Sequence, residues 1–359
     1  MKNIKSLYGI MKSKNYYNYQ KLNYVKYFFS RKQLILSYMP ITISLVSTSK
    51  CPLKCLMCAT HSPLIPKDYK WIQDTENDMS FEVFKKAANM FKEAINLQII
   101  GAGEPLLNKD FYEIVEYGAK KMKFKVKTFS DGITLAANID KLLKSSLDGI
   151  TISINSPNVE DYLRLAGNTK EIYNTIVKDT KKLIEERNRR NSKLKVKVSF
   201  IVDKINYKLI PDMIKMGTEY FNADTIFLVN FLPVPYKGFT FEERTLSTKD
   251  SEILNFINKI KANLTNEERK IVSFPKIVNL KSPKRCKSHF EQIRIDGDGN
   301  ISSCSISLLK MNWGYKIFDY DNGMDAWNNE FFISMRKRFL SESIDDLYKP
   351  CKTCPENFY

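Results

Sequence analysis

The feature that most constrains the fold is a regular alternation of strand and helix patterns from about residue 41 to residue 232. Strands joined by helices pair in parallel through right-handed crossovers. Six such units in about 190 residues are too few for a closed eight-stranded barrel, so the sequence predicts an α/β fold, a partial (β/α)6 TIM-like barrel. Functional residues are then expected at the carboxyl ends of the strands. The predicted strands are 41–47, 97–100, 124–129, 149–155, 194–202 and 225–230, and the predicted helices are 81–95, 111–121, 139–145, 169–189 and 209–221.

The alternation stops near residue 233, where Pro233 and Pro235 interrupt the chain. In the last quarter, two short alternating segments flank the sequence Asp-Gly-Asp-Gly at 296–299, which predicts a β-hairpin whose turn needs a positive φ at Gly299. We expect four regions along the chain. These are a basic and aromatic extension at 1–39, the partial barrel at 40–232, a linker at 233–285 with a helix at 248–264, and a small cysteine-rich α+β extension at 286–359.

Composition excludes several classes of protein. Of the 359 residues, 43% are hydrophobic, which is too many for an intrinsically disordered chain. The longest apolar stretch, 34–46, is interrupted by polar residues and is shorter than the roughly 20 residues that span a bilayer. The N-terminus lacks the apolar core of a signal peptide, so we expect a cytoplasmic protein without a membrane span. The net charge of +17 comes mainly from lysines spread along the chain, so no nucleic-acid partner is expected.

The seven cysteines fall into two groups, and disulfides are not expected in the cytoplasm. The first group is Cys51, Cys55 and Cys58, with the spacing CxxxCxxC on the loop that leaves the first strand. Three thiolates on one loop can hold three irons of a cubane cluster and leave the fourth iron open. A zinc site would need a fourth ligand, for which His61 is the candidate in this segment.

The CxxxCxxC spacing, with Met57 before its last cysteine, resembles the signature of the radical S-adenosylmethionine (SAM) superfamily. The resemblance implies a [4Fe-4S] cluster whose open iron binds the amino and carboxylate groups of SAM. It also implies reductive cleavage of SAM to methionine and a 5'-deoxyadenosyl radical, which abstracts a hydrogen atom from the substrate. A low-potential electron donor, such as a ferredoxin or flavodoxin, is the implied partner.

Other positions match the SAM-binding residues of this superfamily. Gly103 and Glu104 follow the second strand where the family has Gly-Gly-Glu, with Ala102 in place of the first glycine of the pair. Gly103 still allows a tight turn without a side chain, and Glu104 still offers a hydrogen-bond acceptor for an ammonium group. The resemblance further implies contacts to SAM from Met57, Ser130, Ser153, Asn155 and Arg164.

The second cysteine group resembles the SPASM/twitch extension of radical SAM enzymes. Its members are Cys286, Cys304, Cys351 and Cys354, and a helix predicted at 326–336 precedes the last two. The resemblance implies one auxiliary [4Fe-4S] cluster, while a structural zinc site is the alternative for the same four thiolates. His289 is predicted to be a hairpin residue rather than a ligand.

The cysteine count bears on the reaction. Three cysteines for the SAM cluster and four for the auxiliary cluster use all seven, so no thiol is left to return a hydrogen atom to the substrate, as epimerases of the superfamily commonly require. We therefore predict an oxidoreductase that carries out a two-electron oxidation, either a dehydrogenation or an oxidative cross-link, of a small molecule or a peptide. A redox-neutral epimerase or dehydratase, and a non-catalytic iron-sulfur or zinc-binding module, are the alternatives. No residue is predicted as the proton acceptor.

Overall fold

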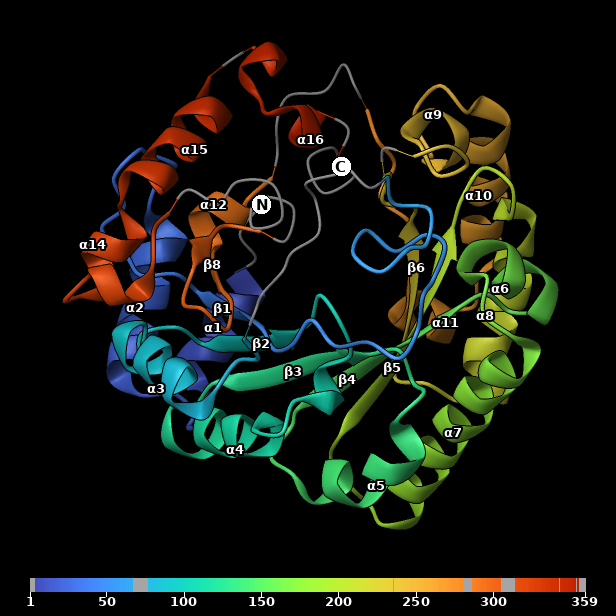
Figure 1. Cartoon of the computed structure of the whole chain (residues 1–359), viewed down its shortest axis with the longest axis horizontal. Coiled ribbons are helices and arrows are strands. Elements are labelled where there is room, and N and C mark those ends of the chain that lie inside the picture. Colours follow the sequence, from blue (N-terminus) through green and yellow to red (C-terminus); the bar gives the residue numbers. More distant parts are fainter. Residues whose placement is uncertain are drawn as a thin grey trace.

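The computed structural model describes residues 4–66, 77–234, 236–279, 286–304, 314–341, 343–352 and 354. Within them, a curved sheet with the strand order β7-β6-β5-β4-β3-β2-β1-β8-β9 forms the centre of the molecule (Figure 1). The six strands predicted from the sequence are neighbours in chain order and parallel, which confirms the partial barrel. They are β1 (Thr42–Val46), β2 (Asn96–Ile100), β3 (Lys125–Ser130), β4 (Gly149–Asn155), β5 (Lys195–Val202) and β6 (Thr225–Asn230).

Three further strands extend this sheet beyond the prediction. A short strand, β7 (Val272–Ser273), pairs with β6 in the segment predicted to be a linker. The predicted hairpin consists of β8 (Gln292–Ile295) and β9 (Ile301–Ser302), and Gly299 in its turn has the expected positive φ of 79°. β8 pairs in parallel with β1, which satisfies backbone groups that β1 would otherwise expose as an edge strand. The hairpin is therefore part of the barrel sheet.

Helices cover the outer, convex side of the sheet, where alternate strand residues form the hydrophobic core (Figure 1). Ser80 caps the first of these helices by accepting a hydrogen bond from the backbone N–H of Val83, as expected from the sequence. The short helices α6, α9 and α11 were not predicted, because four to eight residues are too few for a clear periodic pattern; α6 begins after Asn158 and ends at Ala166, before Gly167. The covering helices are α3 (Phe81–Met90), α4 (Phe111–Glu116), α5 (Leu135–Lys144), α6 (Val159–Ala166), α7 (Lys170–Arg189), α8 (Ile210–Lys215), α9 (Phe241–Arg244), α10 (Ser251–Asn263) and α11 (Asn266–Ile271).

Two of the predicted helices change their winding before they end. The segments 111–121 and 209–221 each finish in a π-helical turn, at Tyr117–Lys121 and Met216–Tyr220. Each turn places a glycine against a core strand: a Cβ on Gly118 would lie 2.8 Å from Leu97, and one on Gly217 would overlap Ile226. The wider turn and the missing side chain let the helix approach the sheet closely.

The N-terminal extension packs onto the barrel as two helices, α1 (Ile4–Lys12) and α2 (Asn18–Phe29). Gln20 on α2 is fully buried, and its side-chain amide donates to the carbonyls of Ala94 and Met122 at 2.7 and 3.0 Å. These carbonyls precede β2 and β3, so α2 satisfies backbone acceptors at the amino-terminal end of the barrel.

The C-terminal extension contains α12 (Ser288–Glu291), α14 (Gly323–Trp327), α15 (Glu330–Leu340) and α16 (Lys349–Lys352). The single helix predicted at 326–336 is divided, because Asn329 interrupts it and caps α15 by accepting from the N–H of Phe332. Arg336 of α15 is completely buried and donates to the carbonyls of His289 and Trp327 at 2.9 and 2.8 Å. These contacts join α15 to α12 and α14.

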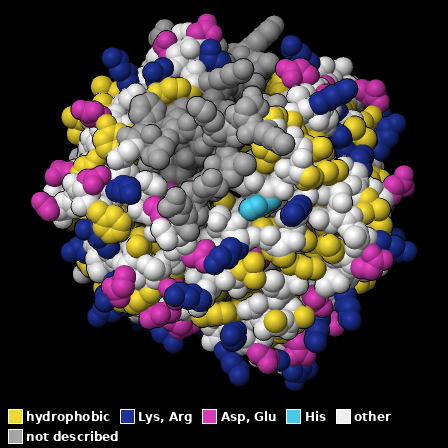
Figure 2. Space-filling model, in the orientation of Figure 1, with side chains coloured by type: hydrophobic (Ala, Val, Ile, Leu, Met, Phe, Trp, Pro, Cys, Tyr) yellow, Lys and Arg dark blue, Asp and Glu magenta, His cyan; other side chains and the backbone are white. Residues whose placement is uncertain are grey.

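The described helices include none that is long and apolar enough to cross a membrane. On the face shown in Figure 2, basic and acidic side chains alternate around the visible described surface, without a large patch of one sign. The distribution on that face agrees with a net charge spread over the molecule.

Candidate functional site

The first cysteine group lies on the loop after β1, and hydrogen bonds join this loop to the turn after β2. Gly103 N–H donates to the carbonyl of Thr48 at 3.0 Å, and Glu104 N–H donates to the carbonyl of Lys50 at 2.8 Å. A Cβ on Gly103 would overlap the backbone of Lys50, so only glycine allows this approach. The neighbouring Ala102 is accommodated, and its carbonyl accepts from the Thr60 hydroxyl at 2.9 Å.

Polar groups surround the three sulfur atoms. Cys58 Sγ accepts from the backbone N–H groups of Thr60 and His61 at 3.4 and 3.3 Å. Cys55 Sγ accepts from the side-chain amide of Asn168 at 3.2 Å, and the thiol of Cys51 lies 3.6 Å from a carboxylate oxygen of Asp131. N–H groups directed at sulfur favour the thiolate form of the cysteine. In a cluster held by cysteines, such hydrogen bonds also shift the reduction potential.

The donor set fits an iron-sulfur cluster. None of the seven cysteines forms a disulfide. Burial raises the pKa of Cys51 to about 12 and that of Cys55 to about 11, so these thiols keep their protons until a metal displaces them. Among the described residues, no group of three or more His, Cys, Asp or Glu side chains is arranged to hold a single metal ion. A cubane cluster does not require three side chains to converge on a single ion, because each thiolate binds its own iron atom.

Glu104 lies beside the cysteine loop with almost no solvent exposure. Its carboxylate accepts two backbone hydrogen bonds, from Leu106 at 3.0 Å and from Asp131 at 2.6 Å. Burial, together with the negative charge of Asp131, raises the pKa of Glu104 to about 8. No lysine or arginine of the described residues forms an ion pair with Glu104 or Asp131, so the buried carboxyl groups are suited to accept hydrogen bonds from an amino group.

The other residues that are predicted to contact SAM lie in different local environments. Ser153 and Asn155 end β4, where the register with β5 shifts by one residue and Asn155 adopts a positive φ of 67°. Ser130 ends β3, but its hydroxyl accepts from Gly132 N–H at 3.0 Å within the following turn. Met57 packs against a small apolar cluster that includes Leu165, Phe231, Val234, Tyr236 and Phe239.

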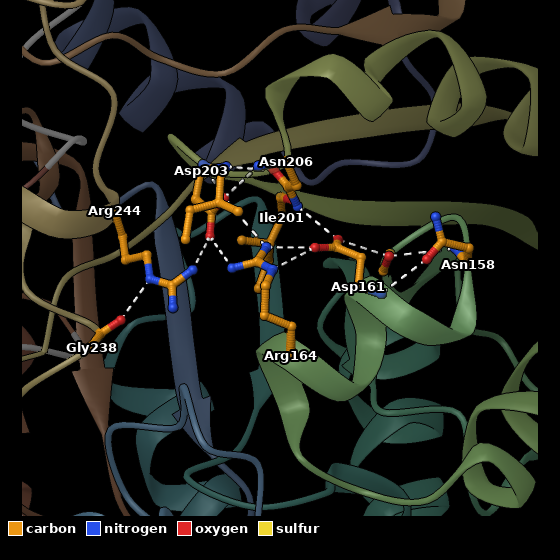
Figure 3. Close-up of polar contacts among 10 residues, drawn as sticks. Asn158, Asp161, Arg164, Ile201, Asp203, Asn206, Gly238 and Arg244 are labelled. Carbon is orange, nitrogen blue, oxygen red and sulfur yellow. Dashed lines mark hydrogen bonds and ion pairs between the residues drawn. The ribbon is translucent and has the colours of Figure 1, made fainter.

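Arg164 on α6 forms ion pairs with two carboxylates (Figure 3). It binds Asp161 through Nε at 2.8 Å and Asp203 through Nη1 and Nη2 at 2.8 and 3.3 Å. Asp203, directly after β5, is fully buried and also accepts from Arg244 at 3.0 Å. Asn206 links the two acids, because its side-chain amide donates to Asp161 and its amide oxygen accepts from Asp203 N–H. Since all three guanidinium nitrogens of Arg164 have carboxylate partners, a contact from Arg164 to SAM stays a prediction.

Asp203 should matter more for stability than most surface acids. Replacing Asp203 with alanine leaves Arg164 and Arg244 close together without their shared counter-ion, so the free energy of unfolding should fall by about 3 kcal/mol. Chemical denaturation measures the change. The matched control is Asp140→Ala, which breaks the exposed ion pair with Arg190 and should leave the free energy of unfolding nearly unchanged. Equal effects of the two substitutions would contradict the proposed importance of the buried network.

Sequence reasoning missed three residues that surround the cysteine loop. Asp131 lies between Cys51 and Glu104, Asn168 contacts Cys55, and the hydroxyl of Tyr236 donates to the carbonyl of Cys58 at 2.6 Å. Asp131 could have been predicted from the sequence, because it follows Ser130 at the end of a strand. Asn168 and Tyr236 carry no local motif, and only the folded chain brings them to the loop.

Two members of the second cysteine group, Cys286 and Cys304, lie at the other end of the barrel strands. β1 and β8 are parallel with Thr42 opposite Gln292; the loop with Cys51 follows β1, whereas Cys286 precedes β8. Cys304 follows the antiparallel strand β9 and so returns to the level where β8 begins. Cys351 lies on α16, and Cys354 follows it. Cys286 and Cys304 are thus separated from the first group by about the height of the sheet, roughly 15 Å for a five-residue strand.

His289 connects parts of this second region. It lies on α12 rather than in the hairpin itself, is fully buried, and its Nδ1 is 2.6 Å from the hydroxyl of Ser303 in the hairpin. Its ring also packs against Phe339 of α15, with centroids 4.3 Å apart. Burial lowers the pKa of His289 to about 3. Its neutral imidazole therefore joins α12, the hairpin and α15.

The chain is similar to known proteins in both sequence and fold. Residues 45–217 match the family model described as the Radical SAM superfamily. A probable GTP 3',8-cyclase from Methanocaldococcus jannaschii is 25% identical over 268 residues, which cover 72% of this chain and 82% of that protein. The structure is also similar to that of SuiB from Streptococcus suis bound to S-adenosylmethionine (TM-score 0.64, 17% identity, 90% of this chain and 77% of SuiB). A second SuiB structure, bound to the precursor peptide SuiA, gives a TM-score of 0.64 at 16% identity over 98% of this chain and 80% of SuiB.

Proposed function

Because the chain belongs to the radical SAM superfamily, we propose that it uses the 5'-deoxyadenosyl radical to oxidise an organic substrate by two electrons. Cys51, Cys55 and Cys58 would hold the [4Fe-4S] cluster, which supplies the electron that cleaves SAM. The buried carboxylate of Glu104 would accept the amino group of SAM, and Gly103 would keep the turn free of bulk. The observation that supports an oxidation is the presence of a second cysteine group, of which Cys286 and Cys304 lie at the opposite end of the barrel.

The electron balance requires an acceptor on the substrate side. Hydrogen abstraction yields 5'-deoxyadenosine and a substrate radical, and the radical becomes an oxidised product by losing one electron and one proton. A cluster held by Cys286, Cys304, Cys351 and Cys354 could take that electron without binding the substrate, since four thiolates leave no iron open. Substrate lying inside the barrel would then be between the two clusters. The same four thiolates on zinc could not accept an electron.

The test is the stoichiometry of a turnover. With the substrate, SAM and a reductant, we expect about one 5'-deoxyadenosine for each product molecule, and a product two hydrogens poorer than the substrate. A product isomeric with the substrate, carrying deuterium from heavy water, would support the redox-neutral alternative. Failure to cleave SAM under strong reductant would support a non-catalytic binding module.

SAM binding should depend on pH through Glu104. Burial and the neighbouring charge of Asp131 raise the pKa of Glu104, which favours the neutral carboxyl group in the SAM-free protein, whereas the ionised form is the stronger acceptor for the amino group of SAM. The dissociation constant of SAM should therefore fall as the pH rises through this raised pKa. Calorimetric titration of the reconstituted protein measures this dependence. Glu104→Gln should bind SAM weakly and without that slope; an unchanged slope in this variant would contradict the role of Glu104.

Reduction of the protein should be sensitive to salt. Low-potential ferredoxins and flavodoxins are usually acidic, whereas this chain has a net charge of +17, so opposite charges should speed their encounter. We expect the rate of reduction by such a donor to fall on the order of tenfold as the ionic strength rises from low to physiological values. Stopped-flow absorbance follows the reaction, with a small chemical reductant as the control. A rate that is independent of salt would argue against charge steering.

A further inference from the structure

The N-terminal extension, 1–39, has an unbalanced charge. It contains seven lysines and one arginine, and the first 67 residues of the chain include no aspartate or glutamate, although the whole chain has 40. Several of these basic side chains form no ion pair with a described residue, namely Lys12, Lys14, Lys21 and Lys26. Their positive charge is therefore not neutralised by an acid of the described chain.

The exposed apolar residues of the first helix, α1, form one stripe. Ile4, Tyr8 and Met11 are spaced i, i+4 and i+7 on one face of the helix, and they are 74%, 59% and 45% exposed. Leu7 and Ile10 lie to one side of this stripe and pack against the core. None of the nine residues of α1 is fully buried. Because so short a helix is marginal in water by itself, a second apolar contact on the stripe would stabilise it.

The second helix, α2, also has exposed apolar side chains. Its inward face, which includes Gln20 and Tyr24, is buried. Leu22 and Phe29 are on the opposite side of the helix and are 57% and 73% exposed. A hydrogen bond of 2.8 Å between the hydroxyls of Ser6 and Tyr24 joins α2 to α1. Large apolar side chains exposed on two joined helices indicate a surface that binds a partner.

Charged groups differ between the two sides of the extension. On the inward side, the carboxylate of Glu291 accepts a hydrogen bond of 2.6 Å from the buried residue Tyr27. On the exposed side, Nζ of Lys12 lies over the ring of Tyr8, 4.4 Å from its centroid. A lysine stem that covers an exposed ring and keeps its ammonium group in water is typical of helices that lie at the surface of a membrane.

We propose that the outward surface of α1 and α2 binds an anionic membrane surface. The apolar stripe would enter the boundary between the headgroups and the acyl chains, and the lysines beside it would bind lipid phosphates. A stripe on a nine-residue helix is smaller than the roughly 800 Å² that each partner contributes to a stable protein interface, whereas a lipid surface adapts to a single helix.

The extension is located far from the cysteine loop. Gln20 of α2 binds the carbonyls of Ala94 and Met122, which precede β2 and β3, whereas Cys51 follows the carboxyl end of β1. A membrane that binds α1 and α2 would therefore lie at the amino-terminal end of the barrel strands. The proposal concerns where the protein acts and does not depend on the reaction proposed above.

The test is co-sedimentation of the reconstituted holoenzyme with lipid vesicles. Vesicles of phosphatidylcholine and phosphatidylglycerol in equal amounts should bind the protein, and pure phosphatidylcholine should bind it roughly tenfold more weakly. Tyr8→Ser combined with Met11→Ser should weaken binding to the anionic vesicles by roughly tenfold, because the apolar stripe is lost. The matched control, Tyr220→Ser, removes a similarly exposed ring after α8 and should leave binding unchanged.

A second pair of variants tests the charge. Lys12→Gln combined with Lys14→Gln should weaken binding to the anionic vesicles by roughly tenfold. Lys178→Gln combined with Lys182→Gln removes the same charge from α7 and should leave binding unchanged. Cleavage of SAM should be equal to wild type in all these variants, because none of the substituted residues lies at the cysteine loop.

One measurement on wild type does not depend on how the variants fold. Bound anionic vesicles should slow hydrogen exchange of the backbone amides of 4–12, read by mass spectrometry. In the absence of lipid, the variants on α1 should melt at the temperature of wild type, because the helix has no buried residue. Unchanged exchange at 4–12, equal binding to both kinds of vesicle, or an equal effect of the control variants would overturn the proposal.

Two other occupants of this surface are outcomes of the same experiments. A dimer in lipid-free solution that Tyr8→Ser dissociates would identify a contact between copies of the chain. If the vesicles do not bind, but the variant without Lys12 and Lys14 is reduced more slowly by an acidic ferredoxin, the occupant is the electron carrier. Either result would overturn the membrane proposal.

Discussion

Replacing Cys51, Cys55 and Cys58 together with alanine should abolish formation of 5'-deoxyadenosine, because these thiolates hold the cluster that supplies the electron for SAM cleavage. Anaerobically reconstituted wild type should contain about eight irons per chain, and the triple variant about four. Iron analysis and chromatography of the SAM-derived nucleoside measure the two effects. Because the three sulfurs lie on one loop at the barrel end, loss of the ligands should leave the core packing intact.

The reciprocal variant is the control for this result. A protein that lacks Cys286 and Cys304 should also contain about four irons, but it should still cleave SAM. Zinc in place of iron at the second group would contradict the auxiliary cluster and return those four cysteines to a structural role. Equal loss of SAM cleavage in both variants would contradict the proposal that the first cysteine group alone holds the cluster that cleaves SAM.

Replacing Cys351 or Cys354 should separate SAM cleavage from product formation. Each substitution removes a ligand of the proposed auxiliary cluster, whereas the groups around Cys55 and Cys58 lie on other elements and are unchanged. We expect slow cleavage of SAM to continue, while the oxidised product falls below detection, because the substrate radical has lost its electron acceptor. Product analysis in heavy water should then show substrate that carries solvent-derived deuterium.

Folding of the second region needs its own control, since metal ligands also stabilise small regions. Ser341→Ala at the end of α15 alters the same region without removing a thiolate, and it should retain iron and product formation. If the Cys351 variant makes oxidised product at the normal rate, the proposed role as electron acceptor is wrong.

Local sequence was sufficient for the strands and for the cysteine loop. β4 and β6 begin and end at the predicted residues, because their apolar runs are bounded by polar or turn-forming residues. The CxxxCxxC spacing and Gly103-Glu104 lie at the carboxyl ends of β1 and β2, as expected for parallel strands. These features depend on spacing along the chain, which a sequence displays directly.

A visible signal in the sequence was nevertheless missed. β3 and β5 alternate lysine with valine at their starts, and such alternation indicates a sheet with one polar face. The prediction gave these segments as strands without assigning a polar face to either of them. The polar interior of the barrel, with Lys127 and Lys197, follows once the register of β3, β4 and β5 is known.

What the sequence determined by itself is the six barrel strands and the spacing of the cysteines, since both depend on residues close together in the chain. The tertiary structure decided which distant residues meet. Only the fold places Asp131 against Glu104, Asp203 against Arg164, and β8 beside β1. These contacts join segments up to about 250 residues apart, and they form because burying edge strands and pairing buried charges lowers the free energy of the whole chain, which no local pattern records.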